Sequence, residues 1–185
     1  NTRLVLVLAS SHEGEDNLIL DSYQQLLADF PELLLTIVPR HPERFDDVAA
    51  LVLDRELSLI RRSEASQKGS LQASTTTQVY LADTMGEMLP ILASADIAII
   101  GGSFIEHGGH NPLEACALAK AVVMGPSDYN FAAISQQLIN QGAMQQANRE
   151  QLTICLKQLL ERPELRAQMG AKGQQVVADN QGAVM

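Results

Sequence analysis

The feature that most constrains the fold of this 185-residue chain is a regular alternation of short apolar runs and amphipathic stretches. The apolar runs have the length of strands and lie at 4–8, 33–38, 57–60, 78–82, 97–100, 121–124 and 143–147. Helical spacing of apolar residues marks 16–30, 43–54, 85–95, 113–119, 130–140, 150–160 and 163–179, whereas the polar stretch 61–77 is expected to be a loop. Continuous apolar strands that alternate with amphipathic helices predict a parallel sheet covered on both faces. We therefore expect an α/β fold, a doubly wound, Rossmann-like domain over residues 1–185.

Composition excludes several classes of function. The net charge of −9 argues against nucleic acid as a partner, because binding to a phosphate backbone needs a basic surface. Cys116 and Cys155 are isolated and show no metal-ligand spacing, so we expect reduced thiols, no metal site and no cofactor. No run reaches the roughly 18 apolar residues of a membrane helix. The chain begins directly in a strand without Met, which we interpret as a fragment of a longer protein, itself soluble.

Ligands of open α/β sheets bind beside the carboxyl ends of the strands. Most of the His, Gly and Pro residues of the chain fall in loops that follow the predicted strands. These loops are SSHEGE at 10–15, PRHPERF at 39–45, DTMGE at 83–87, GGSFIEHGGHNPLE at 101–114 and GPSDYNF at 125–131. Because these loops share one edge of the sheet, their joint pattern indicates a binding site more strongly than any single motif does.

The loop at 101–114 lies between a buried strand and a helix with Pro112 in its first turn. Glycines allow a close approach of the backbone, and free N–H groups at a helix start can hold an anion. This segment therefore suits an anion or a sugar nucleotide. The chain has no Walker lysine, no G-x-G-x-x-G after its first strand and no Ser-His-Asp order, which disfavours an NTPase, a dinucleotide dehydrogenase and a hydrolase.

Simpler interpretations of single residues stay open. Ser11 and Asp16 could be helix caps, and Arg40 and Arg44 could form surface ion pairs. His12 could be an ordinary surface histidine. Thr84 and Glu87 fit a capping box, which would also place the N–H groups of residues 85–87 at a helix start where a phosphate could sit.

The five loop motifs, in this order, strongly resemble the C-terminal half of bacterial 3-deoxy-D-manno-octulosonic acid (Kdo) transferases. The segments that carry the resemblance are SSHEGE, PRHPERF, DTMGE, GGHNPLE at 108–114, and MGP at 124–126 with NF at 130–131. These enzymes are inverting GT-B glycosyltransferases that move Kdo from CMP-Kdo onto lipid A precursor during lipopolysaccharide biosynthesis. The resemblance covers nearly the whole chain.

The resemblance implies roles for individual residues. CMP would lie against Pro39 and Arg40, its phosphate would meet the helix start at Met85, Gly86 and Glu87, and its ribose would be held by Asn111 and Glu114. The loops after the first and fifth strands would meet at the mouth of the cleft, where His and Glu side chains suit the sugar or the acceptor. The residues expected on this sugar or acceptor side are Ser10, His12, Glu13, Gly14, Ser103, Gly109 and His110.

The resemblance also implies a missing N-terminal half that binds the acceptor, supplies the catalytic base and carries the membrane anchor. The intact protein would then work at the cytoplasmic face of the bacterial inner membrane, and the chain alone would be inactive, with no catalytic residue of its own. GT-B folds often end with a helix that crosses onto the other domain; if 163–179 does so, its apolar face would be left exposed or repacked in this chain. Two other functions remain open: a UDP-sugar epimerase or another sugar-nucleotide enzyme of GT-B-like fold, and a non-catalytic binding module.

Overall fold

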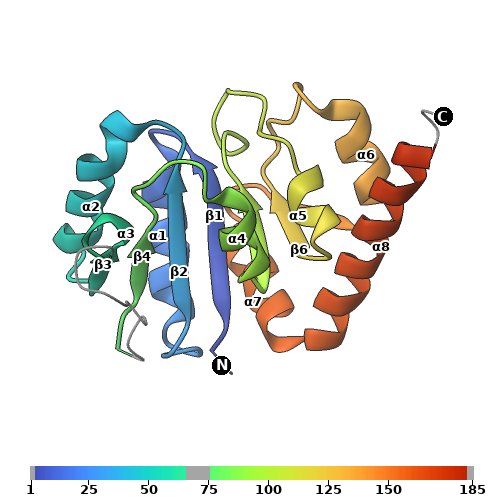
Figure 1. The fold of residues 1–185 in the computed structure, drawn as a ribbon. Coiled ribbons are helices and arrows are strands. Elements are labelled where there is room, and N and C mark those ends of the chain that lie inside the picture. Colours follow the sequence, from blue (N-terminus) through green and yellow to red (C-terminus); the bar gives the residue numbers. More distant parts are fainter. Residues whose placement is uncertain (1–2, 66–75, 183–185) are drawn as a thin grey trace.

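The computed structural model describes residues 3–65 and 76–182, and in these residues seven parallel strands form one sheet (Figure 1). The strands are β1 (Val5–Ser11), β2 (Leu34–Pro39), β3 (Leu59–Arg61), β4 (Val79–Leu81), β5 (Ile97–Ile100), β6 (Ala121–Met124) and β7 (Met144–Gln146). Their order across the sheet is β3-β4-β2-β1-β5-β6-β7, and every neighbouring pair is parallel. The predicted α/β fold is confirmed.

Helices cover both faces of the sheet. The α-helices are α1 (Glu15–Leu26), α2 (Phe45–Asp54), α3 (Arg62–Ala65), α4 (Met88–Ala93), α5 (Leu113–Ala117), α6 (Ala132–Asn140), α7 (Leu152–Glu161) and α8 (Pro163–Gly182), and a 3-10 turn η1 (Pro42–Arg44) precedes α2. Leu6 and Leu8 of β1 join a core with α1, α2 and α7, while Val7 and Ala9 join a second core with α4, α5, α6 and α8. Because successive side chains of a strand point to opposite faces, this double cover favours apolar residues along the central strands, as the sequence shows with exceptions such as the buried Thr36 in β2.

The first strand is longer than predicted and contains an irregularity. Its pairing with β2 shifts between Ala9 and Ser11, and Ser10 lies between them with a φ of +61°. The backbone of β5 approaches closely at this point, since a Cβ on Gly101 would lie 2.2 Å from the Ser10 carbonyl oxygen. Only glycine fits at 101, so the two strands continue side by side into the loops that follow them.

Several boundaries predicted from the sequence are wrong: the helix predicted at 16–30, for example, is α1 and ends at Leu26. Two others lie near the candidate site. The helix predicted at 85–95 is α4, which begins at Met88, because Gly86 has a φ of +83° and Glu87 occupies the N-cap position. The predicted loop at 61–77 begins with ordered structure, namely the end of β3 at Arg61 and the short helix α3. Residues 66–75 of that loop lie outside the described residues.

The long helix α8, which covers the predicted 163–179, packs on this domain in the described residues. It runs along α5 and β6, as Figure 1 shows on the right of the view. Its small residues allow this contact: a Cβ on Gly170 would lie 2.0 Å from the Ala119 carbonyl oxygen. No helix in residues 3–65 and 76–182 combines the length and apolar character that crossing a membrane requires.

Candidate functional site

The candidate site lies where the strand order reverses. β1 pairs with β2 on one side and with β5 on the other, so the loops after β1 and β5 leave the sheet side by side. A crevice at such a switch point is the usual ligand site of an open parallel sheet. The expectation that these two loops meet is confirmed.

Glu15 joins the two loops from beneath. The residue is fully buried, and its carboxylate accepts hydrogen bonds from the backbone N–H groups of Gly102 (2.7 Å), Ser103 (3.0 Å) and Phe104 (3.0 Å). It also accepts one from the N–H of His12 at 3.0 Å. A carboxylate has room for about four such bonds, so Glu15 holds both loops in one arrangement.

This clamp limits what the glycine-rich loop after β5 can offer to a ligand. The N–H groups of Gly102, Ser103 and Phe104 bind the Glu15 carboxylate, whereas the expected anion-holding N–H groups are those of the helix start that follows the loop. A side chain of the protein therefore occupies these three N–H groups of the loop. What remains available to a ligand is the outer surface of both loops.

All four histidines of the chain gather at this edge, and we call His12, His41, His107 and His110 the histidine cluster. Its centre is His12, whose Nε2 lies 2.7 Å from Nε2 of His110 in a nearly parallel ring. The ring centroids of His107 and His41 lie 4.0 and 5.5 Å from that of His12. His12 is only 8% exposed, so the interpretation of this residue as an ordinary surface histidine is wrong.

Two members of the cluster are neutral at pH 7. Burial lowers the pKa of His12 to about 4, and the neighbouring histidines and Arg44 add to the shift. Burial also lowers the pKa of His110 to about 4, with a further contribution from the positive charge of Arg40. Neutral imidazoles offer both a donor and an acceptor to a ligand.

Two residues predicted on the sugar side have structural roles. Ser103 is fully buried; its hydroxyl donates to the Ile100 carbonyl (2.5 Å) and accepts from the Gly125 N–H (2.7 Å). Gly109 is buried at a φ of +72°, and a Cβ there would lie 2.1 Å from the Met124 methyl group. Both residues hold the loop beneath its surface, which does not suit direct ligand contact.

The other residues of this group lie at the surface or near it. Glu13 and Gly14 are exposed, Ser10 is half-buried, and Gly14 forms the N-cap of α1 at a φ of +92°. Asp16 is a buried partner of Arg44, not a helix cap. The Arg44 guanidinium also donates to the Ser11 carbonyl at 2.8 Å, which ties η1 to the end of β1.

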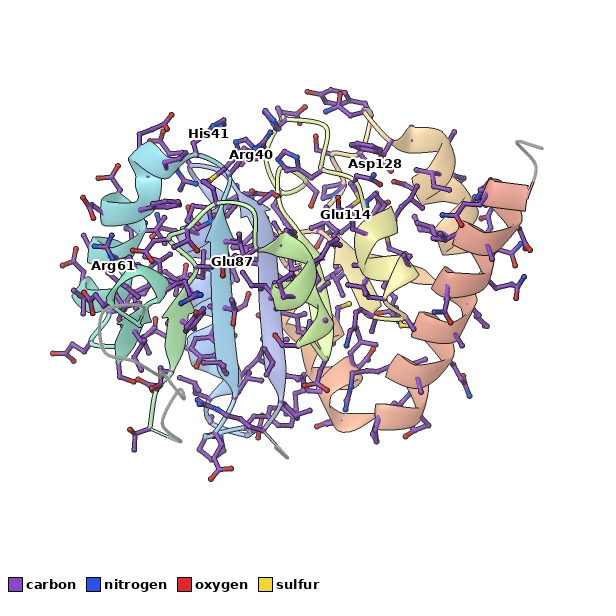
Figure 2. All side chains as sticks on the ribbon, in the orientation of Figure 1. Arg40, His41, Arg61, Glu87, Glu114 and Asp128 are labelled. Atoms are coloured by element: carbon purple, nitrogen blue, oxygen red, sulfur yellow. The ribbon has the colours of Figure 1, made fainter. Side chains whose placement is uncertain are left out.

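Pro39 and Arg40 lie at the end of β2, beside the histidine cluster. Pro39 is buried, whereas Arg40 is exposed and its N–H donates to the Ser11 carbonyl at 3.0 Å. Within the described part of the chain no carboxylate pairs with the Arg40 guanidinium. Figure 2 shows Arg40 and His41 together at the top of the sheet. A planar guanidinium in this position is available to an anionic or planar ligand.

Residues 85–87 form a turn before α4 and not its first turn. Met85 and Gly86 are exposed, and a Cβ on Gly86 would meet no atom within 4 Å. The predicted capping box is absent, because the Thr84 hydroxyl bonds to the Glu87 carboxylate, which also pairs with Arg62 at 3.0 Å. These interactions with Arg62 and Thr84 hold the pKa of Glu87 below its usual range. Glu87 and Arg62 line a hollow of about 390 Å³ beside β2 and β4.

Asn111 and Glu114 flank the start of α5. Asn111 is exposed, and its side-chain oxygen accepts a hydrogen bond from the Leu113 N–H at 3.0 Å. Glu114 is exposed as well and borders a hollow of about 530 Å³ between α5 and the end of α8. Figure 2 places Glu114 lower and further to the right than Arg40. The predicted nucleotide contacts thus spread along the carboxyl edge and do not enclose a pocket by themselves.

Sequence reasoning missed three residues. Glu15 binds N–H groups 87 to 89 positions away, and no local pattern announces such a partner. His107 lies three positions before His110 in a glycine-rich loop, a spacing that was visible in the sequence. Arg62 lies in the stretch that was interpreted as a polar loop, and its ion pair with Glu87, 25 positions away, has no local signal.

The comparisons with known proteins agree on one family. The model of the glycosyl transferases group 1 family matches residues 10–176. The 3-deoxy-D-manno-octulosonic acid transferase of Haemophilus influenzae is 40% identical over 184 residues, which are 98% of this chain and 42% of that enzyme. The enzyme of the same name from Bordetella pertussis is 39% identical over 186 residues, again 98% of this chain and 42% of the relative. The chain thus spans about two fifths of the length of these relatives.

Solved structures extend the agreement to three dimensions. The C-terminal CMP-Kdo binding domain of WaaA from Acinetobacter baumannii superposes with a TM-score of 0.88 at 35% identity, covering 96% of this chain and 90% of that domain. The C-terminal domain of a group 1 glycosyl transferase from Francisella tularensis has the same fold, with a TM-score of 0.64 at 16% identity, covering 95% of this chain and 85% of that domain. The chain therefore belongs to the group 1 glycosyl transferase family, among the relatives of the C-terminal domain of Kdo transferases.

Proposed function

We propose that this chain is the donor-binding half of an inverting glycosyltransferase, and that it binds CMP-Kdo at the carboxyl edge of its sheet. The observation that carries the proposal is the match, at 35% identity and over nearly the whole chain, to a domain described as binding CMP-Kdo. Chemical support comes from the exposed Arg40, with which no carboxylate of the described residues pairs, and from the neutral histidines at the same edge. In the longer protein the activity would be transfer of Kdo to lipid A precursor in lipopolysaccharide biosynthesis.

The nucleotide would spread across the loops after β2, β4 and β5. Arg40, beside Pro39, offers a planar fork to the cytosine or to the donor's negative charge. The phosphate would meet the turn at Met85, Gly86 and Glu87, and the ribose hydroxyls would bind Asn111 and Glu114. Glu114 suits this task because an exposed carboxylate accepts two hydrogen bonds from neighbouring hydroxyls.

The remaining parts of the reaction would belong to the other half of the longer protein. Inverting transfer needs an activated acceptor hydroxyl, and nothing in this chain was predicted to act as that base. We propose that the other half binds the lipid A precursor, carries the membrane anchor and places the site at the cytoplasmic face of the inner membrane. The sugar end of the donor would then face His12, Glu13 and His110, at the junction of the two loops.

Calorimetric titration of the chain with CMP and with UDP tests the donor assignment. We expect CMP to bind more tightly, and Glu114→Ala to weaken CMP binding about 10- to 100-fold, because a hydrogen bond to a charged group contributes about 1.5–3 kcal/mol. Glu106→Ala is the matched control, since Glu106 is an exposed carboxylate of the same loop to which no ligand role is given. A preference for UDP would favour an epimerase-like enzyme, and unchanged CMP affinity in folded Glu114→Ala would remove Glu114 from the site.

A second titration tests the phosphate position. Gly86 has a φ of +83°, so Gly86→Val alters the turn before α4 as well as adding bulk. We expect CMP binding to be lost while cytidine, which lacks the phosphate, binds about as before. Equal losses for CMP and cytidine would contradict a phosphate site at this turn.

A further inference from the structure

The histidine cluster contains three nitrogen donors arranged closely enough to share one ion. His12, His107 and His110 each bring a ring nitrogen, and these three nitrogens lie within 4.8 Å of one another. His41, the fourth histidine, touches the ring of His12 but stands outside this group. We propose that His12, His107 and His110 form a binding site for a divalent transition-metal ion of the zinc class. This inference does not depend on the proposed donor or on the transfer reaction.

The distances require only a small movement. Zn²⁺ binds imidazole nitrogen at about 2.1 Å, so two nitrogens on one tetrahedral ion lie roughly 3.4 Å apart. Nε2 of His12 and Nε2 of His110 are now 2.7 Å apart and point at one another. To share one ion, these two nitrogens must move apart from 2.7 Å to about 3.4 Å, which rotation of the rings can provide. His107 is exposed and therefore has room to turn toward the other two rings.

The protein already orders the backbone that carries these rings. His110 donates its N–H to the Gly101 carbonyl at 3.1 Å, and the Gly109 N–H donates to the Gly102 carbonyl at 2.8 Å. Gly102 leaves the space in which the rings meet, because a Cβ there would lie 3.1 Å from the His107 ring and 3.2 Å from the His110 ring. The Glu15 clamp fixes His12 to the same loop. A preorganised set of ligands loses little conformational entropy when an ion binds.

The chemistry of the donors selects the class of metal. One of the two facing Nε2 atoms must accept the hydrogen bond, so at least one of the two imidazoles has an unprotonated Nε2 with a lone pair that can bind a metal ion. Imidazole suits Zn²⁺, Ni²⁺ and Cu²⁺, whereas Mg²⁺ and Ca²⁺ prefer oxygen ligands. The nearby Arg44 is compensated by its ion pair with Asp16, while Arg40 remains an opposing positive charge that disfavours weakly held ions. Three protein ligands leave a fourth coordination position for water or an oxygen of a ligand.

Metal titrations of the chain at pH 7.5 test the site without any enzymatic assay. We expect saturable binding of one Zn²⁺ per chain, displacement of Co²⁺ with loss of its tetrahedral absorption band, and no competition from Mg²⁺. His107→Gln and His110→Gln should each weaken Zn²⁺ binding by at least tenfold. His41→Gln is the matched control and should remain within about threefold of the parent chain, since His41 touches the same cluster from outside the ligand group.

Thermal unfolding with and without Zn²⁺ separates a specific site from loss of folding. A ligand that binds only the folded state raises the midpoint, so Zn²⁺ should stabilise the parent chain and His41→Gln but not His107→Gln. His107 is exposed, so this substitution is expected to leave the metal-free midpoint unchanged. The proposal is overturned if Zn²⁺ shows no stoichiometric binding, if His107→Gln and His110→Gln bind it normally, or if His41→Gln is impaired as much as they are.

Discussion

At the scale of single residues, the buried carboxylate of Glu15 is the contact on which the site depends most. It contributes no surface to a ligand, yet it accepts four backbone hydrogen bonds from two loops that are far apart in the sequence. A buried side chain that holds two distant loops together in this way can be identified only when the fold is known. The loops themselves were visible in the sequence because their Gly and His content is local information.

Replacing Glu15 by Gln tests this clamp. Glutamine keeps one acceptor oxygen and brings an NH₂ group against backbone donors, so at least two of the four hydrogen bonds are lost and two N–H groups become unsatisfied. We expect a loss of about 2–4 kcal/mol in the free energy of unfolding, measured by urea denaturation. The exposed neighbour Glu13→Gln should change it by less than about 0.5 kcal/mol. A Glu15→Gln protein as stable as the Glu13→Gln control would show that the clamp is energetically unimportant.

At the scale of elements, the weakest sequence inferences concern the segment from β3 to α4. The pattern Thr84-x-x-Glu87 favoured a capping box, but Glu87 has a stronger partner in Arg62, which comes from α3. The long-range ion pair between Glu87 and Arg62, and not the local capping propensity, therefore determines the conformation of this segment. The central strands were predicted well because burial on both faces leaves a continuous apolar run, which is a local signal.

Asp83 ties β3 and α3 to the end of β4, and its contribution depends on pH. Burial raises its pKa, but hydrogen bonds from Ser63 and Arg61 outweigh burial and hold the pKa below the usual range. A depressed pKa in the folded state means that the stabilisation is fully present above about pH 4 and is lost as the pH falls through the folded value.

Asp83→Asn should therefore lower the free energy of unfolding by about 2 kcal/mol at pH 7, with a difference that shrinks in acid below about pH 4. Urea denaturation at a series of pH values measures both quantities. Asp46→Asn is the control, since Asp46 also pairs with Arg61 but is largely exposed, and it should cost less than about 0.5 kcal/mol. A difference between the parent and Asp83→Asn that stays constant down to pH 3 would argue that the charge of Asp83 is irrelevant.

The close packing of α8 on this domain gives a second test at this scale. A Cβ on Gly170 would lie 2.0 Å from the backbone oxygen of Ala119, whereas one on Gly173 would lie 3.2 Å from the Cys116 side chain. A backbone atom cannot move aside as easily as a side chain can, so Gly170→Ala should lower the free energy of unfolding by about 2–4 kcal/mol. Gly173→Ala improves helix propensity by about 1 kcal/mol, which offsets the mild crowding against Cys116. The free energy of unfolding of this variant should therefore be nearly unchanged. Equal thermal midpoints for the two variants would mean that α8 does not pack as described.

At the scale of the whole molecule, the predicted ligand contacts form one wall and not an enclosed pocket. In Figure 2, Arg40 lies at the top of the sheet, whereas Glu114 and Glu87 lie lower, and Glu87 stands beside the start of α4. The chain spans 42% of the length of the Haemophilus and Bordetella relatives. A sequence pattern predicts which residues share an edge, because all strands are parallel. It cannot predict how deeply each residue is buried, which is why Ser103 and Gly109 were placed on the ligand side although they lie beneath the surface.

A set of ligand contacts that does not enclose a pocket should bind nucleotide without transferring a sugar. We expect the isolated chain to bind CMP about tenfold or more weakly than the full-length protein, because one face of the ligand stays in water. We also expect no transfer of Kdo from CMP-Kdo to lipid A precursor by the chain alone, since the acceptor hydroxyl would lack its base. Parallel calorimetry and transfer assays on the chain and the full-length protein measure both effects, with Glu114→Ala in each as the control for specific binding. Transfer by the isolated chain would contradict the division of labour proposed between the two halves.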